Sequence, residues 1–194
     1  MTHPTSSRRF RPTWTAVKTN LRQLDTDGLV GLLHDLYRAS PDNQRFLHGR
    51  LLGSATELEK YRELIADAVF PNPFGRKLVR IAEAQRLVRH YEQATGDVVG
   101  TVDLLLTFVA AGTDQASDLG YGDEAYFAAL GRALESAVKL IRQLGTDDIK
   151  NAKDRLQLIR NRAAKIGWGF SDVVDECADA VLRSHDARPR KSRQ

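Results

Sequence analysis

The sequence predicts an all-α protein, a single compact bundle of about eight helices. Apolar residues recur at three- and four-residue steps along most of the chain, as on one face of a helix. Asp, Ser and Thr precede these segments as caps, and glycines follow them. No stretch alternates β-branched and polar residues as a half-buried strand would. At 194 residues, one core can form without a disulfide or a metal.

The first helices are predicted from their caps. A short helix is expected around Trp14–Leu24. Asp25 or Thr26 then caps a longer helix, because a side-chain oxygen there can accept a free backbone N–H. The apolar residues of this helix share one face: Leu29, Leu32, Leu33, Leu36 and Tyr37. The pattern therefore predicts an amphipathic helix.

Two further helices are expected before a proline break. Ser40 with Pro41 forms an N-cap with proline at the first helical position. The segment 56–59 has the spacing of a capping box, in which a hydroxyl and a carboxylate each accept a backbone N–H. Its helix is expected to run to about Phe70, where the Pro-Asn-Pro segment 71–73 ends it.

The most apolar segment is expected to be the centre of the fold. A helix is predicted over 76–95, with Gly96 at its end and Asp97 as the cap of the next. The helix at 98–111 that follows is apolar nearly all round, so it is expected in the middle of the core. Residues 112–122 are expected to form the one long loop.

Three helices complete the predicted bundle. Asp123 caps the first of them, and Gly145 is expected to close it. The second carries a narrow apolar seam over 147–166. A corner at 167–170 leads to the last helix, which Ser171 is expected to cap.

The net charge of +4 lies at the two ends of the chain. Residues 1–20 carry +4 and residues 183–194 carry +4, which leaves −4 for residues 21–182. We therefore expect a basic, partly disordered arm over 1–20, a helical domain over 21–183 and a basic disordered tail over 184–194.

The sequence contains no sign of secretion or of a membrane span. Its one cysteine, Cys177, cannot form an internal disulfide. The N-terminus has no apolar signal core, and the apolar stretch 98–111 is too short to cross a bilayer. We expect a cytoplasmic protein that does not associate with membranes and has no cofactor.

Catalytic and metal-binding patterns do not occur in the sequence. None of the five histidines stands one helical turn from another His or Cys, so no metal site is expected. The acids next to Cys177 raise the pKa of a thiol, which favours a core role for this residue over a nucleophilic one. We expect no catalytic residues of a recognised kind.

Three residues are predicted structural anchors. Asp103, in the most apolar helix, needs a partner: it pairs with an arginine or caps a helix, or else it faces a pocket as a buried acid. Trp168 and Phe170, at the corner before the last helix, are expected to fill one end of the core. For Trp168 the alternative is stacking against a ligand.

Two helix faces are candidates for binding an anionic partner. The first face comprises Arg76, Lys77, Arg80, Arg86 and Arg89. The second comprises Lys150, Lys153, Arg155, Arg160, Arg162 and Lys165. Arginine on a helix can bind phosphates or acidic partners. It can equally pair with acids of the same protein, as helical spacing allows for Lys150 and Asp154.

Several segments carry a resemblance to known proteins. They are the leucine-rich start through Leu36-Tyr37, Leu58-Glu59-Lys60-Tyr61, the break at Pro71, Asp103-Leu104-Leu105-Leu106, the run from Gly120-Tyr121-Gly122-Asp123 to Tyr126, and Gly167-Trp168-Gly169-Phe170. Together they resemble a bacterial family of helical proteins of unknown function. The resemblance covers about residues 20–182 and leaves both basic ends outside. It implies the helical fold and no activity.

We expect a non-enzymatic helical binding or adaptor protein that contacts another protein. The first alternative is a nucleic-acid-associated protein that uses the basic ends and the two basic faces, with affinity falling steeply as salt rises. The second alternative is an enzyme with a pocket near Asp103 and converging arginines. The sequence leaves the oligomeric state open.

Overall fold

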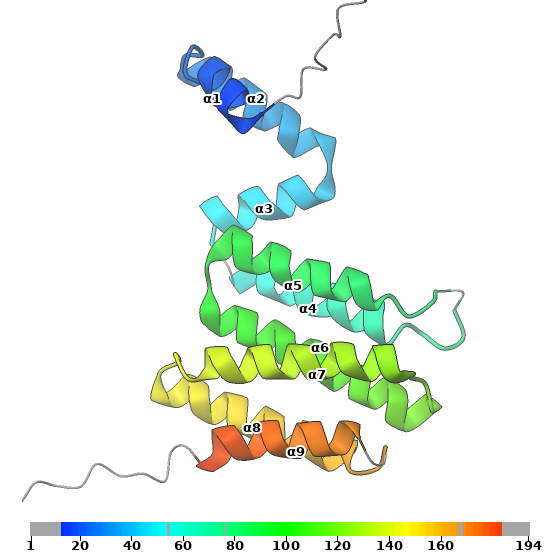
Figure 1. Ribbon diagram of the computed structural model, residues 1–194. Helices are drawn as coiled ribbons and strands as arrows, with labels where there is room; N and C mark the ends of the chain where they lie inside the picture. Colours follow the sequence, from blue (N-terminus) through cyan, green and yellow to red (C-terminus); the bar gives the residue numbers. More distant parts are fainter. Residues whose placement is uncertain (1–12, 54, 76, 167–168, 184–194) are drawn as a thin grey trace, which may run out of the picture. The chain divides into compact units, whose positions relative to one another are not determined.

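The structure is a computed structural model that describes residues 13–53, 55–75, 77–166 and 169–183. Over these ranges it is all-α, with nine helices and no strand. The chain divides into two units between Gln44 and Arg45, inside the domain expected over 21–183. We call the first the N-terminal unit and the second the body, and describe each by itself (Figure 1).

The N-terminal unit contains two complete helices. Helix α1 spans Trp14–Leu21 and α2 spans Thr26–Ala39. Asp25 is the cap of α2, since its Oδ1 accepts a hydrogen bond from the backbone N–H of Gly28 at 2.8 Å. No residue of 13–44 is buried. The unit therefore has no core of its own.

Helix α3 (Pro41–Leu51) crosses the division, and α4 (Ala55–Val69) lies in the body. Ser40 Oγ accepts a hydrogen bond from the backbone N–H of Asn43 at 3.1 Å, so the predicted cap of α3 is confirmed. The capping box predicted over 56–59 is wrong, because α4 has already begun when that segment starts.

Helix α5 spans Ile81–Thr95, so the prediction of a helix over 76–95 placed its start too early. The backbone N–H of Arg80 donates to the carbonyl of Ala68 at 2.7 Å. This bond holds the chain just before α5 against the end of α4, outside a helical conformation. Gly96 ends α5 with φ 66°, a left-handed conformation that favours glycine, as predicted.

Helix α6 spans Val98–Leu119 and runs well past its predicted end at residue 111. The loop predicted over 112–122 is therefore wrong for most of its length. Two acids in this part of the helix, Asp114 and Asp118, pair with an arginine of α8. Asp114 and Asp118 thus lie on the partly exposed side of the helix, whereas Thr113 and Gln115 are buried.

Three helices complete the described body: α7 (Glu124–Ile141), α8 (Thr146–Ala163) and α9 (Phe170–Leu182). Asp123 caps α7, as predicted: its Oδ1 accepts a hydrogen bond from the backbone N–H of Tyr126 at 2.8 Å. Gly145 does not close α7, which ends earlier; it is the N-cap of α8.

Helix α6 is the centre of the body, as predicted. It packs against α4, α5, α7 and α8, while α9 packs against α7 and α8. Successive helices form the pairs α4–α5, α6–α7 and α8–α9, which are stacked in chain order (Figure 1). The largest fully buried side chains include Tyr61, Tyr91, Leu104, Phe108, Leu130, Leu134 and Leu156. The pairs therefore share one continuous core.

Gly112 allows α6 and α7 to approach closely. A Cβ at this position would lie 2.5 Å from Leu130 Cδ2. The Tyr126 hydroxyl of α7 donates to the carbonyl of Gly112 at 2.8 Å, and burial raises the pKa of this hydroxyl. These contacts with α7 explain why α6 continues through a glycine.

Candidate functional site

The first basic face predicted from the sequence is not one helix face. Lys77 and Arg80 precede α5 and both bind the Asp67 carboxylate of α4, with Lys77 Nζ at 2.8 Å and Arg80 Nη2 at 3.0 Å from Oδ2. The hydrogen bond from Lys77 holds the pKa of Asp67 below its ordinary value. Arg86 and Arg89 lie on α5 itself and are exposed. The cations predicted to form one face therefore belong to two groups, one bound to Asp67 before α5 and one on α5 itself.

Arginines of the second basic face bind acids of neighbouring helices. Arg160 Nε lies 2.6 Å from Asp175 Oδ1, and its Nη1 lies 3.1 Å from Asp179 Oδ1, both on α9. Arg162 Nε lies 3.0 Å from Asp114 Oδ1 on α6. These pairs tie α8 to α9 and to α6, so their positive charge is largely balanced within the body.

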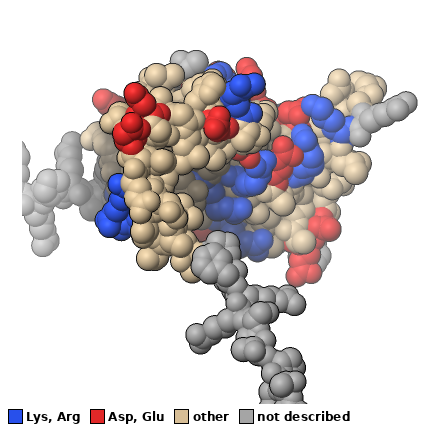
Figure 2. Space-filling model, turned by 90° about the horizontal axis from the view of Figure 1, so that it is seen from above, with Lys and Arg blue, Asp and Glu red and all other residues tan. Residues whose placement is uncertain are grey.

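The lysines of the second face differ from its arginines. Lys153 donates to the backbone carbonyl of Leu182 at 3.3 Å, at the end of α9. Lys150 on α8 and Lys165 in the turn after it are exposed. Figure 2 marks the Lys, Arg, Asp and Glu side chains on the side seen from above, which is not the side of α8.

Asp103 joins three helices. Its Oδ2 accepts a hydrogen bond from Arg62 Nε of α4 at 2.6 Å, and its Oδ1 accepts one from Arg155 Nη1 of α8 at 2.5 Å. Arg155 also donates to Thr107 Oγ1 at 2.9 Å. The hydrogen bond to Asp103 raises the pKa of Arg62. The adjoining cavity of about 200 Å³ is smaller than most ligand pockets.

Phe170 and Trp168 are the anchors predicted at the corner before α9, and the described residues include Phe170 only. It is buried as the first residue of α9, with its ring centroid 5.3 Å from that of Phe127 on α7. The helix therefore begins one residue before the predicted cap, Ser171. Trp168, like Arg76 of the first basic face, lies outside the described residues.

Other chemical features of the described part of the chain are limited. Among its residues, no group of three or more His, Cys, Asp or Glu is placed to hold a metal ion. Cys177 is buried, and burial together with Glu135 and Glu176 raises the pKa of its thiol. No helix in the described ranges is long and apolar enough to cross a membrane.

The body carries a groove on one side of its stack, which we call the α5–α7 groove. Its floor is the α6 surface at Thr101, Leu105 and Phe108, and its walls come from residues 85–92 of α5 and 132–140 of α7. The volume is about 550 Å³. A two-residue link joins α5 to α6, so these helices run antiparallel, and α7 returns beside α6. The two walls therefore run in the same direction.

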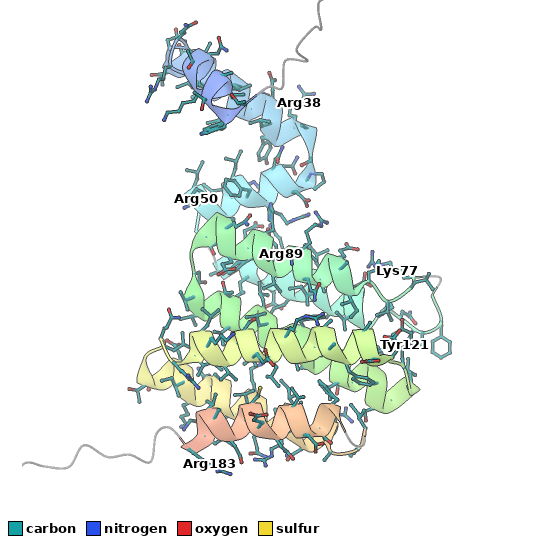
Figure 3. The ribbon with its side chains drawn as sticks, in the orientation of Figure 1. Arg38, Arg50, Lys77, Arg89, Tyr121 and Arg183 are labelled. Atoms are coloured by element: carbon teal, nitrogen blue, oxygen red, sulfur yellow. The ribbon has the colours of Figure 1, made fainter. Side chains whose placement is uncertain are left out.

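Basic side chains line both walls of the α5–α7 groove. Arg89 comes from α5 (Figure 3), whereas Arg132 and Lys139 come from α7. All three are exposed, and none forms a hydrogen bond or an ion pair with another described residue. Glu92 is the one acid among the residues that line the groove. The groove thus combines an apolar floor with an excess of positive charge.

Sequence reasoning identified Arg89 but missed Arg132 and Lys139. Helical spacing suggests an ion pair between Lys139 and Glu135, four residues before it. The structure does not contain this pair, and Glu135 lies on the side of α7 that faces α9. A search for cations on two helices packed against one apolar helix would have found the groove.

Comparisons with known proteins give no relative from which to transfer a function. No family model, curated protein or solved structure matches the chain. The function must therefore be argued from the residues of this chain.

Proposed function

We propose that the protein is a non-enzymatic adaptor that binds another protein through the exposed apolar face of α2. The observation that carries the proposal is the α2 stripe, defined as Leu29, Leu32, Leu33, Leu36 and Tyr37. Its four leucines are between 37 and 47% exposed, and Tyr37 is half-buried. These residues share one side of the helix, because they recur at three- and four-residue steps.

The α2 stripe has the composition of a protein interface. It contains no charged residue; the charged residues of α2, Asp27, Asp35 and Arg38, lie off it. Trp14 and Val17 of α1 add exposed apolar side chains to the same unit. An amphipathic helix is held mainly by packing of its apolar face, and the N-terminal unit offers no core for that purpose. A partner that covers the stripe would supply this packing.

The α2 stripe favours a protein partner over a nucleic acid. Nucleic acid binding depends on cations that contact phosphates, and an uncharged stripe supplies none. Several arginines of the predicted basic faces already bind acids of the body, as Arg160 and Arg162 do. The Asp103 carboxylate is likewise engaged by Arg62 and Arg155, which supports a structural role over a catalytic one.

The experiment compares two double variants of α2 with the wild type. Leu33→Asp with Leu36→Asp places two charges on the stripe, whereas Gly31→Asp with His34→Asp places two on the opposite side. Each protein is used as bait in cross-linking from native lysate at about 50 and 200 mM salt. Circular dichroism checks that both variants keep their helices.

We expect the wild type and the Gly31/His34 control to capture the same protein at both salt concentrations. The Leu33/Leu36 variant should capture at least about tenfold less of it, since burying a charge without a partner is costly. Equal capture by the stripe variant would refute the proposal. If the wild type instead captures nucleic acid at about 50 mM salt and loses it at about 200 mM, the nucleic-acid-associated function is favoured.

A further inference from the structure

We infer that the α5–α7 groove is a binding site for a small amphipathic anion, a molecule with an apolar body and a carboxylate or phosphate head. The site lies wholly within the body and does not rest on the adaptor function of α2. The floor is closely packed, since Phe108 is fully buried and Leu105 is 8% exposed. The apolar surface open to a ligand therefore comes from the edges of Leu105, Val88 and Ala133 and from the half-buried Leu140 of the α7 wall.

The cations of the body are not distributed evenly around it. Six Lys and Arg side chains of the described body form no hydrogen bond or ion pair with a described residue: Arg89, Arg132, Lys139, Arg142, Lys150 and Lys165. Three of these six line the α5–α7 groove. The cavity of about 480 Å³ between α6 and α8 has only one of the six, Lys165, because its Arg162 is already paired with Asp114. The α5–α7 groove therefore has the most positive charge left for a ligand.

The chain direction indicates where the head group lies. Because α5 and α7 run in parallel along the groove, Glu92 and Lys139 share the end near Thr101. These two opposite charges offset each other. Arg89 and Arg132 lie farther toward Phe108, and no second acid lines the groove. Arg132 also borders the cavity on the α9 side of α7, where Glu124 and Glu135 are the acids. Arginine binds carboxylate and phosphate through two parallel hydrogen bonds, so this end suits the head group.

The dimensions favour a small molecule over a protein segment. The wall from Gln85 to Glu92 covers about two helical turns, roughly 10 Å at 1.5 Å per residue. A stable protein interface takes about 20–30 residues a side, which is more than this groove offers. The volume of about 550 Å³ lies within the range of small-molecule sites, about 300–1,000 Å³.

The test is calorimetric titration of the full chain with decanoate and decyl phosphate, which separate the two head groups. Decylamine has the same tail with a cationic head and serves as the negative control. Arg89→Gln and Arg132→Gln remove the proposed head-group contacts. The matched controls are Arg142→Gln and Lys150→Gln, which remove cations of the same kind outside the groove.

We expect one or both anions to bind at a ratio of one per chain, and decylamine not to bind. Arg89→Gln and Arg132→Gln should each weaken binding about tenfold, the loss typical of a charge-assisted contact. The two control variants should change it less than about twofold. Ser136→Leu, at an exposed position on the α7 wall, fills part of the groove without entering the core and should abolish binding while the protein stays folded. If neither anion binds the wild type, or if the Arg89 and control variants bind equally, the inference is wrong.

Discussion

Helices α2 and α7 carry the same apolar pattern and have opposite surroundings. In α7, Tyr126, Leu130 and Leu134 recur at helical spacing and are at most 5% exposed. In α2, the leucines of the stripe follow the same spacing and are at least 37% exposed. The pattern therefore predicts which side of a helix is apolar. Whether that side is covered depends on neighbours that lie far away in the sequence or in another molecule.

The largest expected difference comes from the same substitution in both helices. Leu134→Ala on α7 leaves a cavity in the core and should lower the free energy of unfolding by about 3 kcal/mol. Leu33→Ala on α2 leaves no cavity and should change it by less than about 0.5 kcal/mol. Urea denaturation followed by circular dichroism measures both. Equal losses would show that the α2 stripe is covered in the isolated protein.

Glycine substitutions in the two regions should have opposite signs. A Cβ at Gly112 would meet the Leu130 side chain at 2.5 Å, so Gly112→Ala should destabilise the body by about 1–3 kcal/mol. A Cβ at Gly31 has nothing within 4 Å, so Gly31→Ala should stabilise α2 by up to about 1 kcal/mol. Thermal unfolding reports the first effect, and slower amide hydrogen exchange in α2 reports the second. A stabilising Gly112→Ala would contradict the close packing of α6 on α7.

The smallest effect concerns pH and the Asp67 cluster of the body. The pKa of Asp67 is lowered in the folded state by Lys77, so its ionised form stabilises the fold. That stability is present above the unfolded value of about 4 and is lost as pH falls through the lower folded value. Asp67→Asn should cost less than about 1 kcal/mol at pH 7, because the cluster is largely exposed. The difference from the wild type should disappear in strong acid; a difference that persists there would point to a cause other than charge.

Much of the fold could be predicted because helix caps and apolar periodicity are local signals. Asp25, Asp97 and Asp123 all cap the helices expected of them. The two largest errors, at the end of α6 and at the start of α5, occur where a distant contact overrides the local signal. The sequence pattern predicts a helix end at Gly112, but the packing of Leu130 and Tyr126 of α7 against this glycine favours a continuous helix. The start of α5 likewise depends on a bond that the chain makes back to α4.

The candidate sites were harder to predict than the fold. The sequence does not show which acid, if any, each cation contacts, so it does not distinguish a paired arginine such as Arg160 from one such as Arg89 that pairs with no described residue. In the structure, Arg160 binds two acids of α9, and Arg89 faces a groove. The other groove cations, Arg132 and Lys139, lie on a different helix from Arg89. Only the packing of α5 and α7 on α6 brings them to one groove.

The central position of α6 has a consequence for how the protein is made. The apolar α6 is complete at Leu119, but α8, which covers one of its sides, is complete only at Ala163. Translation of these roughly 45 residues takes on the order of 2 to 9 s at about 5–20 residues per second. Arg155, the last member of the Asp103 cluster, also arrives in this interval. Each new chain therefore passes through an interval of seconds in which the α8 side of its most apolar helix is not yet covered.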